Sequence, residues 1–287
     1  MPFVARRLFR GYNKVANMNP QSPFNGQLLG EASVCYSGGL DSTWVAYQVA
    51  SRGKRVHLHT LDHGHGYLFN RWSRKTSRSL ASSVGQDLVT HAFLDTKDLF
   101  KDVALANILG DINKYGESFG CCLGCTMAMV TKIVIYNLEH QVAYIMMGSS
   151  VGGQYAVMSM PVIIQLQREF CARFGLIYSA PLIEDQVVKA VERRDLSHAG
   201  VSTGARFLDK HSFGNQGYCL LSLQHLPDVL LNMHPNYDPA AVERFFLDKL
   251  PLCEAYIQQH FSRAGASLEE AVARMRKITG VEQEART

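Results

Sequence analysis

Long apolar runs and strong charge are both missing from this chain of 287 residues, and their absence excludes whole classes of protein. No run of about eighteen consecutive apolar residues occurs, so the sequence predicts neither a membrane-spanning helix nor a membrane partner. The net charge of +4 permits contact with RNA but is mild for a dedicated nucleic-acid-binding domain. With 47% hydrophobic and 19% charged residues, the composition is that of an ordinary globular enzyme.

Acidic residues are absent from the first seventeen positions, which carry Arg6, Arg7, Arg10 and Lys14. The continuous apolar core of a secretory signal is absent as well. We therefore interpret 1–29 as a basic, poorly ordered N-terminal segment rather than as an organelle-targeting helix. A cytoplasmic location is expected.

Cysteine is unevenly distributed, and its total of seven is odd. Cys121, Cys122 and Cys125 are clustered, whereas Cys219 lies far downstream. In a reducing compartment such a cluster indicates metal or sulfur chemistry before it indicates a disulfide scaffold. The remaining three stand alone in apolar surroundings and are expected to be small core residues: Cys35, Cys171 and Cys253.

Short apolar runs alternate with helical patterns from residue 30 to about residue 180. Strands are predicted at 32–36, 55–61, 88–94, 142–147 and 176–179. Helices are predicted at 42–52, 69–84, 97–113, 126–140 and 160–174. This alternation predicts a doubly wound, Rossmann-like α/β fold, in which a parallel sheet has helices on both faces. Ligands of such folds bind beyond the carboxyl ends of the strands.

The later part of the chain is mainly helical, with helices predicted at 184–196, 238–260 and 267–278. No repeat or low-complexity linker marks a sharp boundary before it. We expect three segments: a basic N-terminal segment over 1–29, an ATP-binding α/β domain over 30–183, and a mainly helical C-terminal region over 184–287 packed on the sheet.

A candidate phosphate-binding loop occupies 37–42, where SGGLDS joins a predicted strand to a predicted helix. Two glycines let backbone N–H groups approach an anion, which then faces the positive end of the helix dipole. The lysine of a Walker A loop and the third glycine of a dinucleotide fingerprint are both missing. An ordinary Gly-Gly turn is the simpler interpretation, but it requires neither of the serines nor the aspartate.

A strand followed by SGGLDS resembles the pyrophosphate loop of the PP-loop ATP pyrophosphatase superfamily. Its members cut ATP between the α and β phosphates and place AMP on a substrate oxygen. The resemblance implies that ATP is bound with Mg²⁺, which Asp41 helps to hold, while backbone groups near Thr60 and Leu61 hold the adenine. The nucleotide-binding residues it implies are Ser37, Gly38, Gly39, Asp41, Ser42, Thr60, Leu61 and Gly148.

Cys122 and Cys125 form a C-x-x-C motif at the predicted start of the helix over 126–140. A helix dipole there would lower the pKa of the thiols and favour the thiolate, the form that binds metals and attacks sulfur. A zinc site would need a fourth ligand, such as His211 or His225. Lys132, further along the helix, is either a substrate-binding lysine or a solvated one.

The C-x-x-C downstream of a PP-loop resembles the sulfur-transferring branch of the superfamily, which includes tRNA 2-thiolation enzymes and thiopurine-forming relatives. Some members hold a 4Fe–4S cluster with three cysteines, an arrangement that Cys122, Cys125 and Cys219 match in order and approximate spacing. Others use a cysteine persulfide, for which Cys121, Cys122 or Cys125 would serve. The paired zinc modules of many tRNA-thiolating relatives are absent here, so the acceptor stays open between a base in tRNA and a free purine.

The resemblance implies an ATP-dependent sulfurtransferase that adenylates a carbonyl oxygen of a nucleobase, or of another small carbonyl compound, and replaces it by sulfur from a separate donor. Asp41, Cys122 and Cys125 are the catalytic residues it implies. The first alternative is an amide- or nitrile-forming ligase that uses ammonia, with structural cysteines. The second is a nucleotide-binding module without catalysis. A homodimer is among the assemblies that the sequence allows.

A basic face is predicted on the helix over 69–84, where four residues recur at spacings of three and four. These residues are Arg71, Arg74, Lys75 and Arg78. The face is either merely solvated or holds the phosphates of a nucleotide or an RNA.

Overall fold

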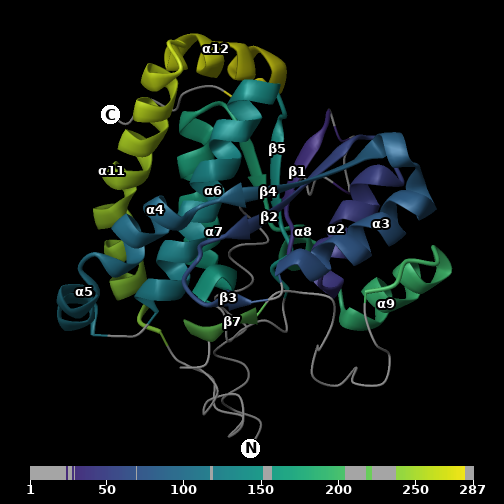
Figure 1. The fold of residues 1–287 in the computed structure, drawn as a ribbon, viewed down its shortest axis with the longest axis horizontal. Helices are drawn as coiled ribbons and strands as arrows, with labels where there is room; N and C mark the ends of the chain where they lie inside the picture. The colour runs from purple at the N-terminus through teal and green to yellow at the C-terminus, as the bar shows by residue number, and fades with distance from the viewer. Residues whose placement is uncertain are drawn as a thin grey trace, which may run out of the picture.

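A five-stranded parallel sheet forms the centre of the protein, whose computed structural model describes residues 24, 28, 30–68, 70–116, 119–150, 157–203, 218–221 and 237–281. The strand order is β4-β2-β1-β5-β6, and each neighbouring pair runs parallel (Figure 1). The strands are β1 (Ala32–Cys35), β2 (Val56–Asp62), β4 (Val89–Asp95), β5 (Tyr144–Met147) and β6 (Ile177–Ser179).

The winding of the chain reverses at β1. From β1 the chain moves outward to β2 and β4, then returns to the other side of β1 and continues through β5 and β6. The predicted doubly wound sheet is confirmed by this order. Ligand sites of such sheets lie at the switch point, which here falls between the carboxyl ends of β1 and β5.

Helices cover both faces of the sheet (Figure 1). One face carries α2 (Leu40–Ala50), α3 (Ser73–Val84) and α9 (Lys189–His198), with α2 in contact with the other two. The other face carries α6 (Gly120–His140) and α7 (Pro161–Arg173), on which α11 (Pro239–Arg263) packs, with α12 (Leu268–Thr279) beside α6 and α11. Shorter helical pieces are η1 (Asn70–Trp72), η2 (Gln86–Leu88), α4 (Lys97–Phe100), η3 (Lys101–Leu105), α5 (Ile108–Tyr115), η4 (Val157–Ser159) and α8 (Pro181–Glu184).

Three predicted helices differ from those in the structure. The helix predicted at 184–196 begins only at Lys189, because Gln186, with a φ of +51°, separates α8 from α9. The helix predicted at 97–113 is divided into α4, the π-helical η3 and α5. The helix predicted at 126–140 begins at Gly120 instead, because two glycines in its first turns are sites of close packing rather than helix breaks. A Cβ at Gly124 would lie 2.7 Å from Cβ of Ala104, and one at Gly120 would lie 3.2 Å from the ring of Phe245.

Helix α6 is also the single helix in the described ranges that has the length and composition of a membrane span. Of its most apolar window, 72% is buried inside the protein. Buried side chains recur along its whole length and belong to the central core, so α6 serves as a core helix between the sheet and α11.

A second, two-stranded sheet was not predicted. It pairs β3 (Tyr67–Leu68) with β7 (Tyr218–Cys219) in antiparallel register, with Tyr67 opposite Cys219. Strand β3 closely follows the carboxyl end of β2, so the pairing carries Cys219 to the edge of the main sheet where β2 ends.

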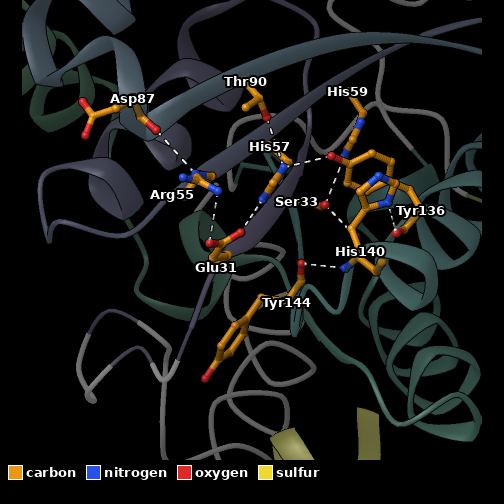
Figure 2. Close-up of polar contacts among 11 residues, drawn as sticks. Glu31, Ser33, Arg55, His57, His59, Asp87, Thr90, Tyr136, His140 and Tyr144 are labelled. Atoms are coloured by element: carbon orange, nitrogen blue, oxygen red, sulfur yellow. Dashed lines mark hydrogen bonds and ion pairs between the residues drawn. The ribbon is translucent and has the colours of Figure 1, made fainter. Parts of the chain in front are cut away.

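The opposite, amino edge of the sheet holds a polar network (Figure 2). His57 Nε2 lies 2.7 Å from Glu31 Oε2, and its Nδ1 lies 2.9 Å from the hydroxyl of Tyr136. Ser33 Oγ lies 3.0 Å from His59 Nε2. His57 and His59 are thus buried, hydrogen-bonded residues of the core.

Candidate nucleotide site and thiol group

The loop over 37–42 is a closed turn between β1 and the first turn of α2. Gly38 has a φ of +81°, in the left-handed region that favours glycine, and Gly39 is the N-cap of α2. The backbone N–H of Ser37 donates to Ser42 Oγ at 3.3 Å, and that of Gly39 donates to Ser37 Oγ at 3.2 Å. Both serine side chains therefore hold the turn closed, and the N-terminus of α2 is left to face an anion.

Gly148 borders this loop from the turn after β5. A Cβ at this position would lie 2.7 Å from the backbone nitrogen of Ser42 and 2.9 Å from its α-carbon. Only glycine leaves room for so close an approach of two backbones. The two segments that flank the switch point are thus in direct contact, and the nucleotide-binding role of Gly148 stays a prediction.

Thr60 connects β2 to the same loop. Its hydroxyl lies 2.8 Å from the carbonyl oxygen of Tyr36, the residue before the loop, and 2.9 Å from Ser73 Oγ at the start of α3. The pairing of β1 with β2 ends at His59, so the backbone of Thr60 and Leu61 extends past β1 beside the loop. Both residues are buried, backbone included, so the expected contact of Thr60 and Leu61 with an adenine stays a prediction.

Asp41 has a partner that the sequence did not suggest. Its carboxylate forms an ion pair with Lys189, the first residue of α9. Lys189 Nζ also lies 3.5 Å from Oε1 of Glu192, whose side chain is fully buried. Burial and the nearby Asp41 carboxylate raise the pKa of Glu192. Trp44 Nε1 donates to Asp195 Oδ2 at 3.0 Å and fixes α9 against α2.

The thiols of α6 lie at the same edge of the sheet as this loop. Helix α6 leads into β5, which is parallel to β1, so its last turn lies at the amino edge and its first turns at the carboxyl edge. Figure 2 shows the last turn, with His140, beside the amino-edge network. Cys35, the last residue of β1, donates from Sγ to Met129 Sδ of α6 across 3.9 Å. One helical turn separates Met129 from Cys125.

Cys219 joins this group through the β3–β7 pairing. Its Sγ lies 3.4 Å from Nε2 of His63, directly after β2. Burial, and then the charge of Cys219, raise the pKa of the Cys121 and Cys125 thiols. The predicted lowering of the thiol pKa is therefore wrong for Cys125 of the C-x-x-C motif, because burial outweighs the helix dipole there.

Solved structures resemble this chain, whereas family models and curated proteins do not. No family model matches the sequence, and no curated protein matches it either. Among solved structures, the chain is similar to the U34-tRNA thiolase NcsA from Methanococcus maripaludis with its 4Fe–4S cluster. The identity is 14% and the TM-score 0.38, and the match covers 85% of this chain and 78% of that one. The chain is also similar to NMN synthetase from Francisella tularensis, at 13% identity and a TM-score of 0.39; that match covers 83% of this chain and 91% of the other.

The SGGLDS turn joins β1 to α2 at the switch point of the parallel sheet. The fold is a doubly wound parallel α/β sheet, with this turn where the PP-loop resemblance of the sequence predicts a nucleotide site. The turn over 37–42, called the PP-loop below because of its sequence resemblance, is closed by its own serines and carries an Asp41 that is already paired with a lysine.

The thiols next to the PP-loop are of the kind that binds metal ions, but in the described part of the chain they do not surround a metal site. All seven cysteines are free thiols, and thiolates are the ligands that iron–sulfur clusters require. In the described part of the chain, no three His, Cys, Asp or Glu side chains are arranged to hold a metal ion. His211 and His225, the zinc ligands considered from the sequence, lie outside the described residues.

Sequence reasoning missed two residues near the PP-loop. Lys189 and Glu192 reach it through the packing of α9, and no spacing in the sequence signals those contacts. Lys132, the lysine that the sequence did single out, is instead bonded to Tyr256 of α11, with Nζ 2.6 Å from the hydroxyl.

Proposed function

We propose that this protein is an ATP-dependent sulfurtransferase. It adenylates a carbonyl oxygen of a nucleobase, releases pyrophosphate and replaces the oxygen by sulfur. The observation that supports this best is the gathering of thiols beside the PP-loop: the first turns of α6, with Cys122 and Cys125, and the β7 residue Cys219 lie at the carboxyl edge where β1 enters the loop.

In the activation step, the backbone N–H groups of the PP-loop and the N-terminus of α2 hold the phosphates of ATP. The substrate carbonyl oxygen attacks the α-phosphorus, the bond from that phosphorus to the bridging oxygen breaks, and pyrophosphate leaves against the loop. Mg²⁺, when bound, would neutralise charge on the phosphates, with Asp41 as its protein ligand. Preorganised donors of this kind stabilise developing negative charge without reorganisation.

In the sulfur step, hydrosulfide adds to the activated carbon and the carbon–oxygen bond to AMP breaks. The sulfur proton is lost to solvent, and a thiocarbonyl remains. Sulfur enters at the oxidation level of sulfide, so neither an oxidant nor a reductant is needed. A 4Fe–4S cluster on Cys122, Cys125 and Cys219 would supply iron as a Lewis acid for this sulfide, and its binding would require the three thiols to move closer together than in the structure. A persulfide on Cys121, Cys122 or Cys125 is the alternative: its outer sulfur would displace AMP, a second thiol of the group would then cleave the S–S bond to form a disulfide, and an external thiol reductant would restore both cysteines.

The acceptor is, in this proposal, a base within an RNA rather than a free purine. The segment 70–84 contains no acidic residue and four basic ones, which are Arg71, Arg74, Lys75 and Arg78. In the described part of the chain, none of these four forms an ion pair. All four are exposed, and the side chain of Trp72 between them is 48% exposed. A basic surface with an exposed aromatic ring suits phosphates and an unstacked base. The Thr60–Ser73 contact joins this surface to the PP-loop.

The test is product analysis with anaerobically purified protein. Iron and acid-labile sulfide are measured first; the protein is then incubated with MgATP and sulfide, together with either tRNA or free purines. We expect pyrophosphate release and, by mass spectrometry, a base heavier by the replacement of oxygen with sulfur.

The decisive variant is the triple Cys121→Ala, Cys122→Ala, Cys125→Ala protein. We expect it to lose thiolation, whereas Cys171→Ala, in the core of α7, keeps its turnover per folded molecule. Protein without iron or sulfide whose triple variant retains full turnover would refute sulfur transfer. Incorporation of ammonia in place of sulfide would favour the ligase instead.

A further inference from the structure

The PP-loop lacks a lysine of its own, yet a lysine ammonium lies at its aspartate. Asp41 stands at the start of α2, where a nucleotide's phosphates would approach, and Lys189 reaches it from a helix 148 positions away in the sequence. The Lys189 and Asp41 side chains are 37% and 29% exposed. The pair therefore borders solvent, and the ammonium has a path away from the carboxylate.

A second carboxylate faces the same ammonium. Glu192 follows Lys189 by one helical turn on α9, and its side chain has no exposed surface. In the described part of the chain, the polar neighbours of its carboxyl group are the Asp41 carboxylate and the Lys189 ammonium, and the ammonium lies 3.5 Å from Oε1. A buried carboxyl group is costly as an anion, so it needs either a proton, which the raised pKa of Glu192 favours, or a cation beside it.

We propose that Lys189 has two positions: without nucleotide it fills the place of the divalent cation between Asp41 and Glu192, and with MgATP it moves to the departing pyrophosphate half. This inference rests on the proposed use of ATP. The exchange balances charge, because Mg²⁺ replaces the ammonium between the carboxylates and the ammonium meets the phosphates. Mg²⁺ sites of this kind combine one or two carboxylates with phosphate oxygens and water.

Helix α9 is suited to such an exchange because its attachment does not depend on Lys189. The Trp44–Asp195 hydrogen bond and the buried Leu196 hold α9 against α2, one to two turns beyond the lysine. The flexible stem of Lys189 can thus move while the helix stays in place. Lys189 would supply to the pyrophosphate the positive charge that a Walker A loop supplies from within its own sequence.

The test separates metal binding from phosphate binding by using the ligands one at a time. Three proteins are compared: the wild type, Lys189→Met and Lys189→Arg. Each is titrated with Mn²⁺ alone, and binding is detected by the electron paramagnetic resonance signal of Mn²⁺. In a separate experiment, each is titrated with magnesium pyrophosphate and binding is measured by calorimetry. We expect Lys189→Met to bind Mn²⁺ more tightly than the wild type, because the competing ammonium is gone. It should bind magnesium pyrophosphate weaker by roughly tenfold or more, because the substitution removes a charge-assisted hydrogen bond. Lys189→Arg should recover part of the pyrophosphate affinity.

Glu192→Gln, combined with Lys189→Met, checks the second carboxylate. The double variant should lose the gain in Mn²⁺ affinity. Lys114→Met is the matched control, because Lys114 forms an exposed ion pair with Asp248 between α5 and α11. That variant should leave both affinities unchanged, and thermal unfolding verifies that every variant is folded.

The outcomes distinguish this inference from the function on which it rests. If wild-type protein binds neither MgATP nor magnesium pyrophosphate, the proposed function fails and this inference fails with it. If the wild type binds both and Lys189→Met binds Mn²⁺ and pyrophosphate as the wild type does, Lys189 is a structural ion pair and this inference alone is wrong.

Discussion

Gly148 and Ser42 come from opposite sides of the switch point and touch through their backbones, so that a single added carbon atom at Gly148 would lie 2.7 Å from the Ser42 nitrogen. The turn after β5 is therefore part of the surface that keeps the PP-loop in place. Because the contact is between backbones, no change of rotamer can relieve it.

Gly148→Ala should reduce the rate of pyrophosphate release by roughly tenfold or more, because overpacking at this point, which costs roughly 1–3 kcal/mol, displaces the first turn of α2. Release is measured with a coupled phosphate assay. Gly30→Ala is the matched control, since its nearest neighbour would be Cβ of Ala143 at an ordinary 3.9 Å. Equal rates in the two variants would show that the close approach does not shape the loop.

Cys219→Ala should remove sulfur transfer and leave ATP activation in place, because its thiol belongs to the cysteine group and not to the PP-loop. The expected result is continued pyrophosphate release with no thiolated product, together with loss of iron if the thiols hold a cluster. Cys253→Ala, in the interior of α11, serves as the control for removal of a thiol. Undiminished thiolation by Cys219→Ala would assign the chemistry to α6 alone.

Replacing three basic residues of α3 should weaken binding to RNA: Arg74→Gln, Lys75→Gln and Arg78→Gln. For each phosphate that a basic side chain no longer neutralises, the slope of log affinity against log salt should become shallower by about 0.7 to 0.9. The measurement is fluorescence anisotropy with a labelled tRNA over a range of salt. The matched control removes the same charge from the exposed sides of α11 and α12 through Arg263→Gln, Arg274→Gln and Lys277→Gln. Equal slopes in the two triple variants would return the acceptor to free purines.

The stability of the protein should fall as the pH drops from about 6.5 towards 4, in part because of His91. Burial, and then the charge of Arg74, lower the pKa of His91 to about 4. The unfolded chain takes up a proton below its ordinary pKa of about 6.5, whereas the folded chain refuses it until about 4, so folding loses free energy as the pH falls through that window. The loss is about 1.4 kcal/mol for each pH unit and each proton.

Urea denaturation between pH 4.5 and 7 measures this loss. His91→Gln, which keeps a donor and an acceptor for Thr60 and Ser77, should have a shallower pH dependence than the wild type. His198→Gln, on the exposed side of α9, should leave the dependence unchanged. A wild-type slope in His91→Gln would assign the acid sensitivity to other groups.

The sheet could be predicted from the sequence because its strands are buried apolar runs punctuated by glycines, and each predicted strand occurs within a residue or two of its place. The start of α6 was misplaced because Gly120 and Gly124 have a low helix propensity. Their role is to admit Ala104 and Phe245, which are tertiary contacts that propensity cannot express.

The candidate site, too, could be predicted only where its residues are contiguous in the sequence. The PP-loop is contiguous, so its glycines and serines could be identified directly. Lys189 and Glu192 act on it across a helix–helix contact, and Cys219 reaches α6 through a strand of two residues. Such a strand is too short to leave an alternating pattern. The thiol pKa was predicted with the wrong sign because a sequence shows which residue begins a helix but not how deeply that residue is buried.

The hydrogen-bonded histidines of the amino edge lie at the opposite end of the strands from the PP-loop. Substitutions of Glu31, His57 or Tyr136 should change how much folded protein a cell accumulates and leave the turnover of each folded molecule unaltered. Substitutions at the amino edge of the sheet should therefore act on the amount of folded protein, whereas substitutions at the carboxyl edge should act on the proposed reaction.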